Sequence, residues 1–136
     1  MSISRVQLKA LSRLRRREAQ LLFEARLYDG AAYLAGYAVE LALKARICRV
    51  LDLTEYPDTG EMRRTFATHD LNQLLKLAGL ERKLETSGSS LVEMWPSVAR
   101  SLPERRYQAA GTTTEAEVRG ILNAVDEVRR WITKYW

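Results

Sequence analysis

The most suggestive chemical groups in the sequence stand together at Arg105, Arg106 and Tyr107. Two guanidinium groups can grip a phosphate, and a neighbouring phenol ring can stack on a nucleobase. The surrounding residues 103–113, PERRYQAAGTT, predict a joint between helices, and surface joints are where such side chains often act. This pattern favours a loop that binds RNA or a nucleotide.

The same cluster also has a structural explanation. Tyr107 and Trp95 can fill space between helices, while the two arginines pair with Glu104 or Glu93. The sequence leaves both interpretations open.

Glu40 and Lys44 are charged residues within a largely apolar segment. They are four residues apart, in the order that favours an ion pair on a helix. Charges in such a segment are seldom fully buried unless they are paired. One interpretation is a structural pair, with Lys44 extending to water along its stem. The other is a functional site in which Glu40 positions Arg105 or Arg106.

His69 is the single histidine of the chain. Any acid–base chemistry that uses an imidazole would therefore depend on it. Its setting, Thr68-His69-Asp70 before an apolar run, is also typical of a helix start, where Thr68 or Asp70 would cap free amides. The residue is thus a candidate both for catalysis and for an ordinary structural position.

Basic side chains are concentrated at the start of the chain, because residues 1–27 hold seven basic and two acidic groups. On a helix, four of them would form a ridge within about a quarter of the circumference. The ridge consists of Arg5, Lys9, Arg13 and Arg16. Such a ridge either attracts phosphate chains or is a solvated face. Apolar residues lie broadly opposite, with Glu18 at their centre, where it could pair with Lys44, Arg46 or a dimer partner.

Several kinds of chemistry have no matching pattern. One histidine, one cysteine (Cys48) and scattered carboxylates give no metal-ligand spacing. The seven glycines fit neither the phosphate-loop nor the dinucleotide pattern, and no nucleophile elbow is found. We therefore expect neither a metal nor a cofactor.

The chain of 136 residues is the size of one domain, and 46% hydrophobic with 29% charged residues is typical of a globular protein. We expect residues 1–136 to form a single helical domain. No stretch of about 18 apolar residues could span a membrane, and the start has no apolar core of a signal peptide. These features predict a cytoplasmic protein without a membrane association.

Helical periodicity dominates the sequence, and no alternating pattern indicates a strand. The segment 31–51 is apolar on nearly every side, which predicts a central, buried helix. Asp29 is expected to cap it, and a loop is expected over 52–68. The other helices are expected at 4–28, 71–78, 90–102 with a kink at Pro96, and from Thr114 to the end. The expected fold is an all-α, up-and-down bundle of four to five helices.

The chain resembles the HEPN-domain family of small all-α prokaryotic toxins and defence ribonucleases. The resemblance rests on the block 28–45, YDGAAYLAGYAVELALKA, followed in order by His69-Asp70-Leu71, Trp95 and Arg106-Tyr107. It implies a bundle of four or five helices that usually forms a homodimer. The small-residue face of 31–51, with Trp131 and Trp136, agrees with a dimer.

Active members of the family cut RNA with an Arg-x4-6-His motif near the start of the last helix. Arg106 matches the opening of that motif, but the residue six positions later is Thr112 rather than histidine. Some relatives are modified by a nucleotidyltransferase antitoxin on a tyrosine two residues after that histidine, where this chain has Thr114. The nuclease motif is therefore degenerate.

Three functions follow for a member of a prokaryotic toxin–antitoxin or defence system. The first is a module that binds RNA, a nucleotide or a partner protein through Arg105, Arg106, Tyr107 and the ridge. The second is a metal-independent endoribonuclease, in which Arg106 stabilises the phosphorane and Glu40 or His69 moves the proton. The third is a non-catalytic partner of a nucleotidyltransferase.

Overall fold

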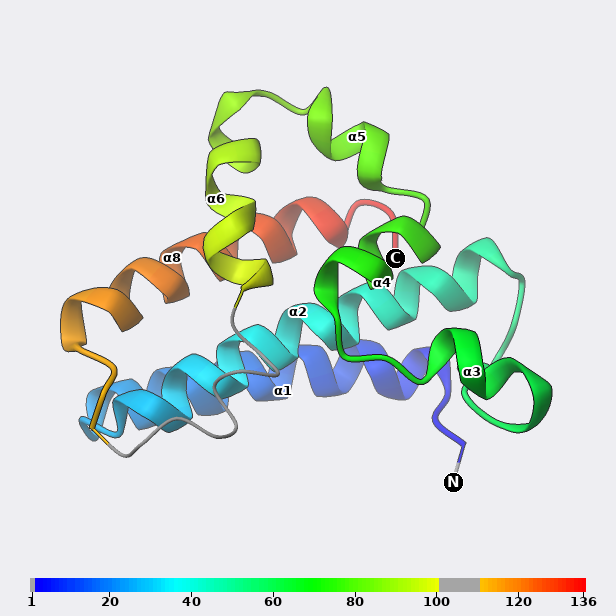
Figure 1. Cartoon of the computed structure of the whole chain (residues 1–136). Helices are drawn as coiled ribbons and strands as arrows, with labels where there is room; N and C mark the ends of the chain where they lie inside the picture. The colour runs from blue at the N-terminus through cyan, green and yellow to red at the C-terminus, as the bar shows by residue number, and fades with distance from the viewer. Residues whose placement is uncertain (1, 101–110) are drawn as a thin grey trace.

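A computed structural model describes residues 2–100 and 111–136 (Figure 1). All regular structure in these two ranges is helical, apart from one isolated bridge between Ser4 and Glu55. The fold is therefore all-α, as the sequence predicts. The helices are α1 (Arg5–Glu24), α2 (Tyr28–Val50), the short 3₁₀ helix η1 (Gly60–Met62), α3 (Arg63–Phe66), α4 (Leu71–Leu77), α5 (Glu81–Glu85), α6 (Ser89–Ala99) and α8 (Glu115–Ile132).

Helix α2 is the centre of the molecule. It lies side by side with α1 along most of its length, and α4 and α8 pack on its other sides (Figure 1). Small residues such as Ala35 and Gly36 are buried along it and allow these neighbours to approach closely. An apolar surface on every side is what a helix surrounded by other helices needs.

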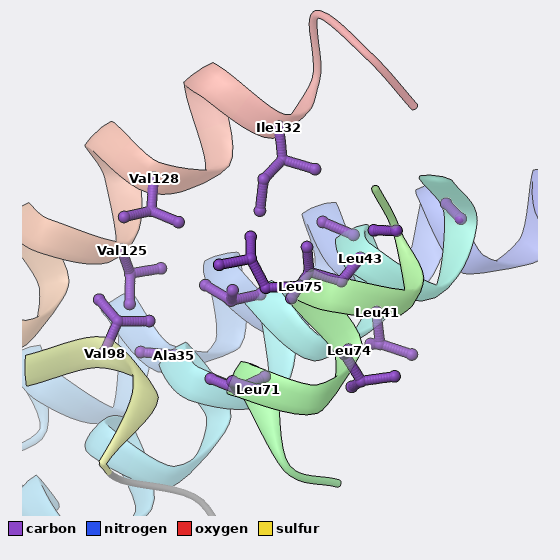
Figure 2. Packing of buried hydrophobic residues seen from close by; sticks show 14 of the residues in the cluster. Ala35, Leu41, Leu43, Leu71, Leu74, Leu75, Val98, Val125, Val128 and Ile132 are labelled. Atoms are coloured by element: carbon purple, nitrogen blue, oxygen red, sulfur yellow. The ribbon is translucent and has the colours of Figure 1, made fainter. Parts of the chain in front are cut away.

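The core joins α4, α6 and α8 to α2. Val125, Val128 and Ile132 of α8 point toward α2 and α4, and Val98 of α6 lies beside Val125 (Figure 2). Each of these four side chains is completely buried. The apolar stripe that the sequence predicts on the last helix therefore packs as expected. Full burial of one such side chain is worth about 1.5–3 kcal/mol.

Helix ends follow the capping signals of the sequence. The side chain of Thr114 accepts a hydrogen bond from the Glu117 amide at 3.2 Å, and α8 begins directly after it. Asp70 caps α4 by accepting hydrogen bonds from the amides of Asn72 and Gln73. Such a cap typically contributes about 1 kcal/mol.

Two expected features around Asp29 are corrected. Helix α1 ends at Glu24 rather than at residue 28, and α2 begins at Tyr28, so Asp29 lies inside its first turn instead of capping it. The Asp29 carboxylate accepts hydrogen bonds from the backbone amides of Gly111, at 2.7 Å, and Thr113, at 3.2 Å. It therefore ties the start of α2 to the segment that leads into α8.

Residues 52–68 are more structured than the loop expected there, because they contain η1 and α3. Tyr56 fixes this segment: its hydroxyl donates to the Phe66 carbonyl at 2.8 Å, and the two rings meet edge to face with centroids 6.1 Å apart. The described helices thus exceed the four to five expected. The additional ones, η1, α3 and α5, are three to five residues long.

The buried side of α1 is not the apolar side that a helical wheel indicates. Its buried residues are Leu8, Ser12 and Ala19, which lie between the apolar and the basic sides. Part of the apolar side is left exposed, with Leu14 at 45% and Leu21 at 57% exposure.

Among the described residues, none of the helices combines the length and the apolar character that a membrane span requires.

Candidate functional site

The candidate site is centred on Glu40, in the middle of α2. Its side chain is completely buried, although the surrounding helix is almost entirely apolar. A buried carboxylate is costly unless charged or hydrogen-bonding partners surround it. Its partners therefore decide what the residue does.

Lys44 is the first partner of Glu40. Its Nζ lies 3.0 Å from Glu40 Oε2, one helical turn further along α2. The ammonium also lies 5.1 Å from the ring centroid of Tyr56. The structural pair that the sequence spacing suggests is thus present, and it is largely buried rather than extended to water.

His69 is the second partner. Its Nδ1 lies 2.9 Å from the same oxygen, Glu40 Oε2. The imidazole comes from the joint between α3 and α4, where Asp70 caps the following helix. The two interpretations of this segment are therefore compatible: Asp70 starts the helix, and His69 points to a buried carboxylate. Nearly half of the His69 side chain, 48%, is exposed.

Two of the three catalytic candidates of the sequence, Glu40 and His69, are thus brought together. A carboxylate on Nδ1 fixes the orientation of an imidazole and leaves Nε2 as the nitrogen that can exchange a proton. The same negative charge stabilises the imidazolium once it forms. This is the arrangement of an oriented acid–base group at a surface.

Tyr56 is the fourth member of the site, and the sequence analysis did not identify it. It is 3% exposed, and it touches both Lys44 and the Phe66 carbonyl, three residues before His69. Burial, and then the negative charges of Asp58 and Glu40, raise the pKa of Tyr56 well above its ordinary value. The residue therefore stays a neutral hydrogen-bond donor at physiological pH. Its only sequence signal is an aromatic residue in a polar segment.

Two arginines of α3 precede His69 closely in the sequence. Arg63 and Arg64 are both exposed, and within the described ranges neither forms an ion pair. Exposed guanidinium groups attract phosphate. The third catalytic candidate, Arg106, lies outside the described residues together with Arg105 and Tyr107.

The basic ridge of α1 faces α8 and the last residues of the chain. Arg16 forms a two-pronged contact with Asp126, with N–O distances of 2.6 and 2.8 Å. Lys9 and Arg13 lie over the ring of Trp136. Arg5 donates to the Trp136 carbonyl at 2.9 Å. Arg16 is therefore neutralised by an ion pair, whereas the other three surround an aromatic residue.

Two expectations that rest on single residues are corrected. Glu18 pairs with Arg15 on its own helix, not with Lys44 or Arg46. Trp131 and Trp136 are buried within the chain at 5% and 9% exposure, so they are not exposed interface residues.

Within the described residues, no group of three histidine, cysteine, aspartate or glutamate side chains could hold a metal ion.

The comparison with protein families agrees with this architecture. The family profile described as the HEPN domain matches residues 8–135, which is nearly the whole chain. The chain belongs to the HEPN family. No curated protein and no solved structure matches it.

HEPN membership supports a module of a nuclease-like or toxin and defence class. Position 112, where the motif would place its histidine, is an exposed threonine in the segment before α8. The imidazole of this HEPN domain is instead at His69, in the joint between α3 and α4, where it contacts Glu40 of α2. The site geometry therefore differs from the pattern that the resemblance implies.

Proposed function

We propose that this HEPN domain is a metal-independent endoribonuclease of a prokaryotic toxin–antitoxin or defence system, acting in the cytoplasm. The observation that carries the proposal is the 2.9 Å contact between the half-exposed imidazole of His69 and the fully buried carboxylate of Glu40. An imidazole held in this way can move a proton at the surface, where a large substrate can reach it.

The reaction would be attack of a ribose 2′-hydroxyl on the adjacent phosphodiester. His69 Nε2 accepts the hydroxyl proton while the bond from the 2′-oxygen to phosphorus forms. The bond from phosphorus to the 5′-oxygen breaks, and that oxygen takes a proton from water. The products are a 2′,3′-cyclic phosphate and a 5′-hydroxyl end. Arg106 is proposed to stabilise the phosphorane.

Glu40 is a positioning residue in this scheme. Its carboxylate sets the imidazole orientation and balances the positive charge that His69 gains during the reaction. Lys44 lies 3.0 Å from the same oxygen, so its ammonium and the imidazole share one carboxylate oxygen. Proton uptake by His69 then occurs at the exposed edge of the site.

The test is cleavage of a mixed-sequence, fluorescently labelled RNA in excess chelator. His69→Ala is expected to lower the rate at least 100-fold, because general acid–base catalysis contributes about 10²–10⁴-fold. Asp70→Ala, purified in parallel, is the matched control: it changes the neighbouring residue and the helix cap but leaves the imidazole. Its rate should stay within a few-fold of the unaltered protein. Equal rates for His69→Ala and the unaltered protein, or no cleavage by either, would refute the proposal.

A second candidate is an RNA-, nucleotide- or partner-binding module without cleavage. It is favoured by the 3.0 Å ion pair that Lys44 forms with Glu40 Oε2, because an ion pair also gives this carboxylate a structural role. The threonine at position 112 supports the same interpretation. RNA binding by both the unaltered protein and His69→Ala, with no cleavage by either, would select this candidate.

We also propose that the domain works as a homodimer, with a nucleotidyltransferase-type antitoxin as a further partner. The surface that supports the dimer is an exposed apolar stripe on α1, formed by Val6, Leu14 and Leu21. Beside it, Leu21 and Leu22 line a shallow pocket of about 270 Å³ together with Glu18 and Leu34. Exposed apolar side chains in a row are typical of an interface.

A further inference from the structure

Five cations from two helices gather around residues 135–136. We call this group the basic cluster. It consists of Arg5, Lys9 and Arg13 of α1 together with Arg46 and Arg49 of α2. Helical periodicity places the first three in a row with one-turn spacing, about 6 Å apart along the axis. The two α2 residues extend the row sideways.

The α1 members are arranged around one indole ring. Lys9 Nζ lies 5.5 Å and the Arg13 guanidinium 5.0 Å from the ring centroid of Trp136. Arg5 holds the carbonyl of the same residue with Nη2, and its buried Nε has no hydrogen-bond partner. An aromatic face balances a cation only partly, since such contacts are worth about 0.5–2 kcal/mol.

The α2 members approach the same two residues from the other helix. Arg46 donates to the carbonyls of Ala78 and Tyr135. Arg49 donates from one nitrogen, Nη1, to the main-chain oxygens of both Tyr135 and Trp136. Arg49 is exposed. All of these acceptors are main-chain oxygens rather than aspartate or glutamate side chains.

The positive charge of the cluster is not compensated by acidic side chains. Within residues 2–100 and 111–136, none of the five cations forms an ion pair with an aspartate or glutamate. Burial, and then the neighbouring charges of Arg5, Arg13 and Arg49, lower the pKa of Lys9. Burial and Arg49 likewise lower the pKa of Arg46. Arg13 and Arg49 are the exposed members, and cations at a surface without an aspartate or glutamate partner attract a polyanion.

We propose that the basic cluster binds the phosphate backbone of single-stranded RNA. Regularly spaced cations match a chain of phosphates, and the exposed guanidinium groups of Arg13 and Arg49 can contact it directly. Arg49 follows Glu40 by nine residues on α2, and therefore lies on the opposite face of the helix from the buried carboxylate that positions His69. The cluster is thus a docking surface separate from His69. The inference takes RNA as ligand from the proposed function, but it requires no cleavage.

The experiment measures the anisotropy of a fluorescein-labelled, mixed-sequence single-stranded RNA against salt concentration. The test variant is Arg13→Gln/Arg49→Gln, because these are the two exposed members of the cluster. The control is Arg26→Gln/Arg82→Gln, which removes the same charge from two exposed positions, one in the turn between α1 and α2 and one on α5. Circular dichroism melting confirms that each variant is folded.

The test variant is expected to bind about tenfold or more weakly at low salt. Its slope of log affinity against log salt should fall by about 1.4, since each phosphate contact to a single strand contributes about 0.7. The control should bind like the unaltered protein. A variant with Arg13 and Arg49 both changed to lysine retains the charges and should recover most of the affinity.

Two results would overturn the inference. One is equal weakening by the test and control variants, which would mean that only the net charge matters. The other is the absence of RNA binding by the unaltered protein at low salt. His69→Ala separates this inference from the proposed function, because it should lower the cleavage rate at least 100-fold while leaving both the RNA affinity and its salt slope unchanged. If cleavage occurs, the test variant should raise KM and leave kcat within a few-fold.

Discussion

Changing Glu40 to glutamine tests the buried pair at the centre of the site. The substitution keeps the shape of the side chain but removes its charge, so Lys44 is left as a cation in a pocket where its side chain is 11% exposed. Breaking a buried ion pair by removing one partner costs about 3–5 kcal/mol. The Tyr56 ring, 5.1 Å from the ammonium, compensates part of this cost. We therefore expect a loss near the lower end, about 3 kcal/mol.

Such a loss is measurable without unfolding the protein, since domains of this size are stable by about 5–15 kcal/mol. Urea denaturation at pH 7, followed by circular dichroism, gives the free energy of unfolding. The midpoint should fall while the slope m stays constant. The informative companion is Glu40→Gln/Lys44→Met, which removes both charges. Replacing a buried pair by neutral groups of similar volume is often close to neutral, so the double variant should regain all but about 1 kcal/mol.

The reasoning fails if Glu40→Gln costs less than about 1 kcal/mol, because a completely buried, paired carboxylate should cost more. It also fails if the double variant is less stable than Glu40→Gln, since the uncompensated Lys44 charge would then not be the cause of the loss. Lys44→Met alone completes the cycle and gives the coupling energy between the two side chains.

Two further predictions concern the surroundings of the site. The raised pKa of Tyr56 means that the folded state favours the neutral phenol, so its contribution to stability is complete below pH 10 and is lost as the pH rises above it. Tyr56→Phe should flatten the fall in urea midpoint between pH 9 and 11. It should also lower the free energy of unfolding at pH 7 by about 1 kcal/mol through the lost hydrogen bond to Phe66. An unchanged dependence of the urea midpoint on alkaline pH would contradict this. Leu14→Lys/Leu21→Lys should convert a homodimer to monomers in sedimentation velocity at micromolar concentration, with an unchanged helical spectrum; a persistent dimer would exclude the α1 stripe as the interface.

The sequence predicts the large elements because each carries its own signal. Helix α8 has an apolar stripe at helical spacing behind the Thr114 cap, and α2 is apolar on every side. The short helices η1, α3 and α5 carry no such signal, because three to five residues cannot form a stable helix alone and are fixed by packing. Tyr56, which anchors the segment before α4, is recognisable only once its contacts to Phe66 and Lys44 are known.

In the candidate site, too, one contact follows from local sequence and another depends on tertiary packing. The Glu40–Lys44 pair follows from a spacing of four residues on one helix. The contact between Glu40 and His69 joins residues 29 positions apart, and it depends on how the joint before α4 packs against α2. Local pattern therefore identifies both residues as candidates but does not connect them. The same limitation hides Arg46 and Arg49, whose relation to the α1 cations exists only in three dimensions.

Helix α1 connects the proposed surfaces. A helical wheel establishes that Arg5, Lys9 and Arg13 share a side, but it cannot show that this side meets Trp136 while Leu14 and Leu21 remain exposed. The exposed apolar stripe and the basic cluster lie on adjacent sides of this helix, roughly a quarter turn apart. Association through the stripe would therefore bring the basic clusters of two protomers to the rim of the interface. A longer RNA could then contact both, so a Leu14→Gln/Leu21→Gln variant, which breaks the stripe without adding charge, should bind a long RNA more weakly than the dimer does. A short RNA that spans one cluster should bind both proteins equally.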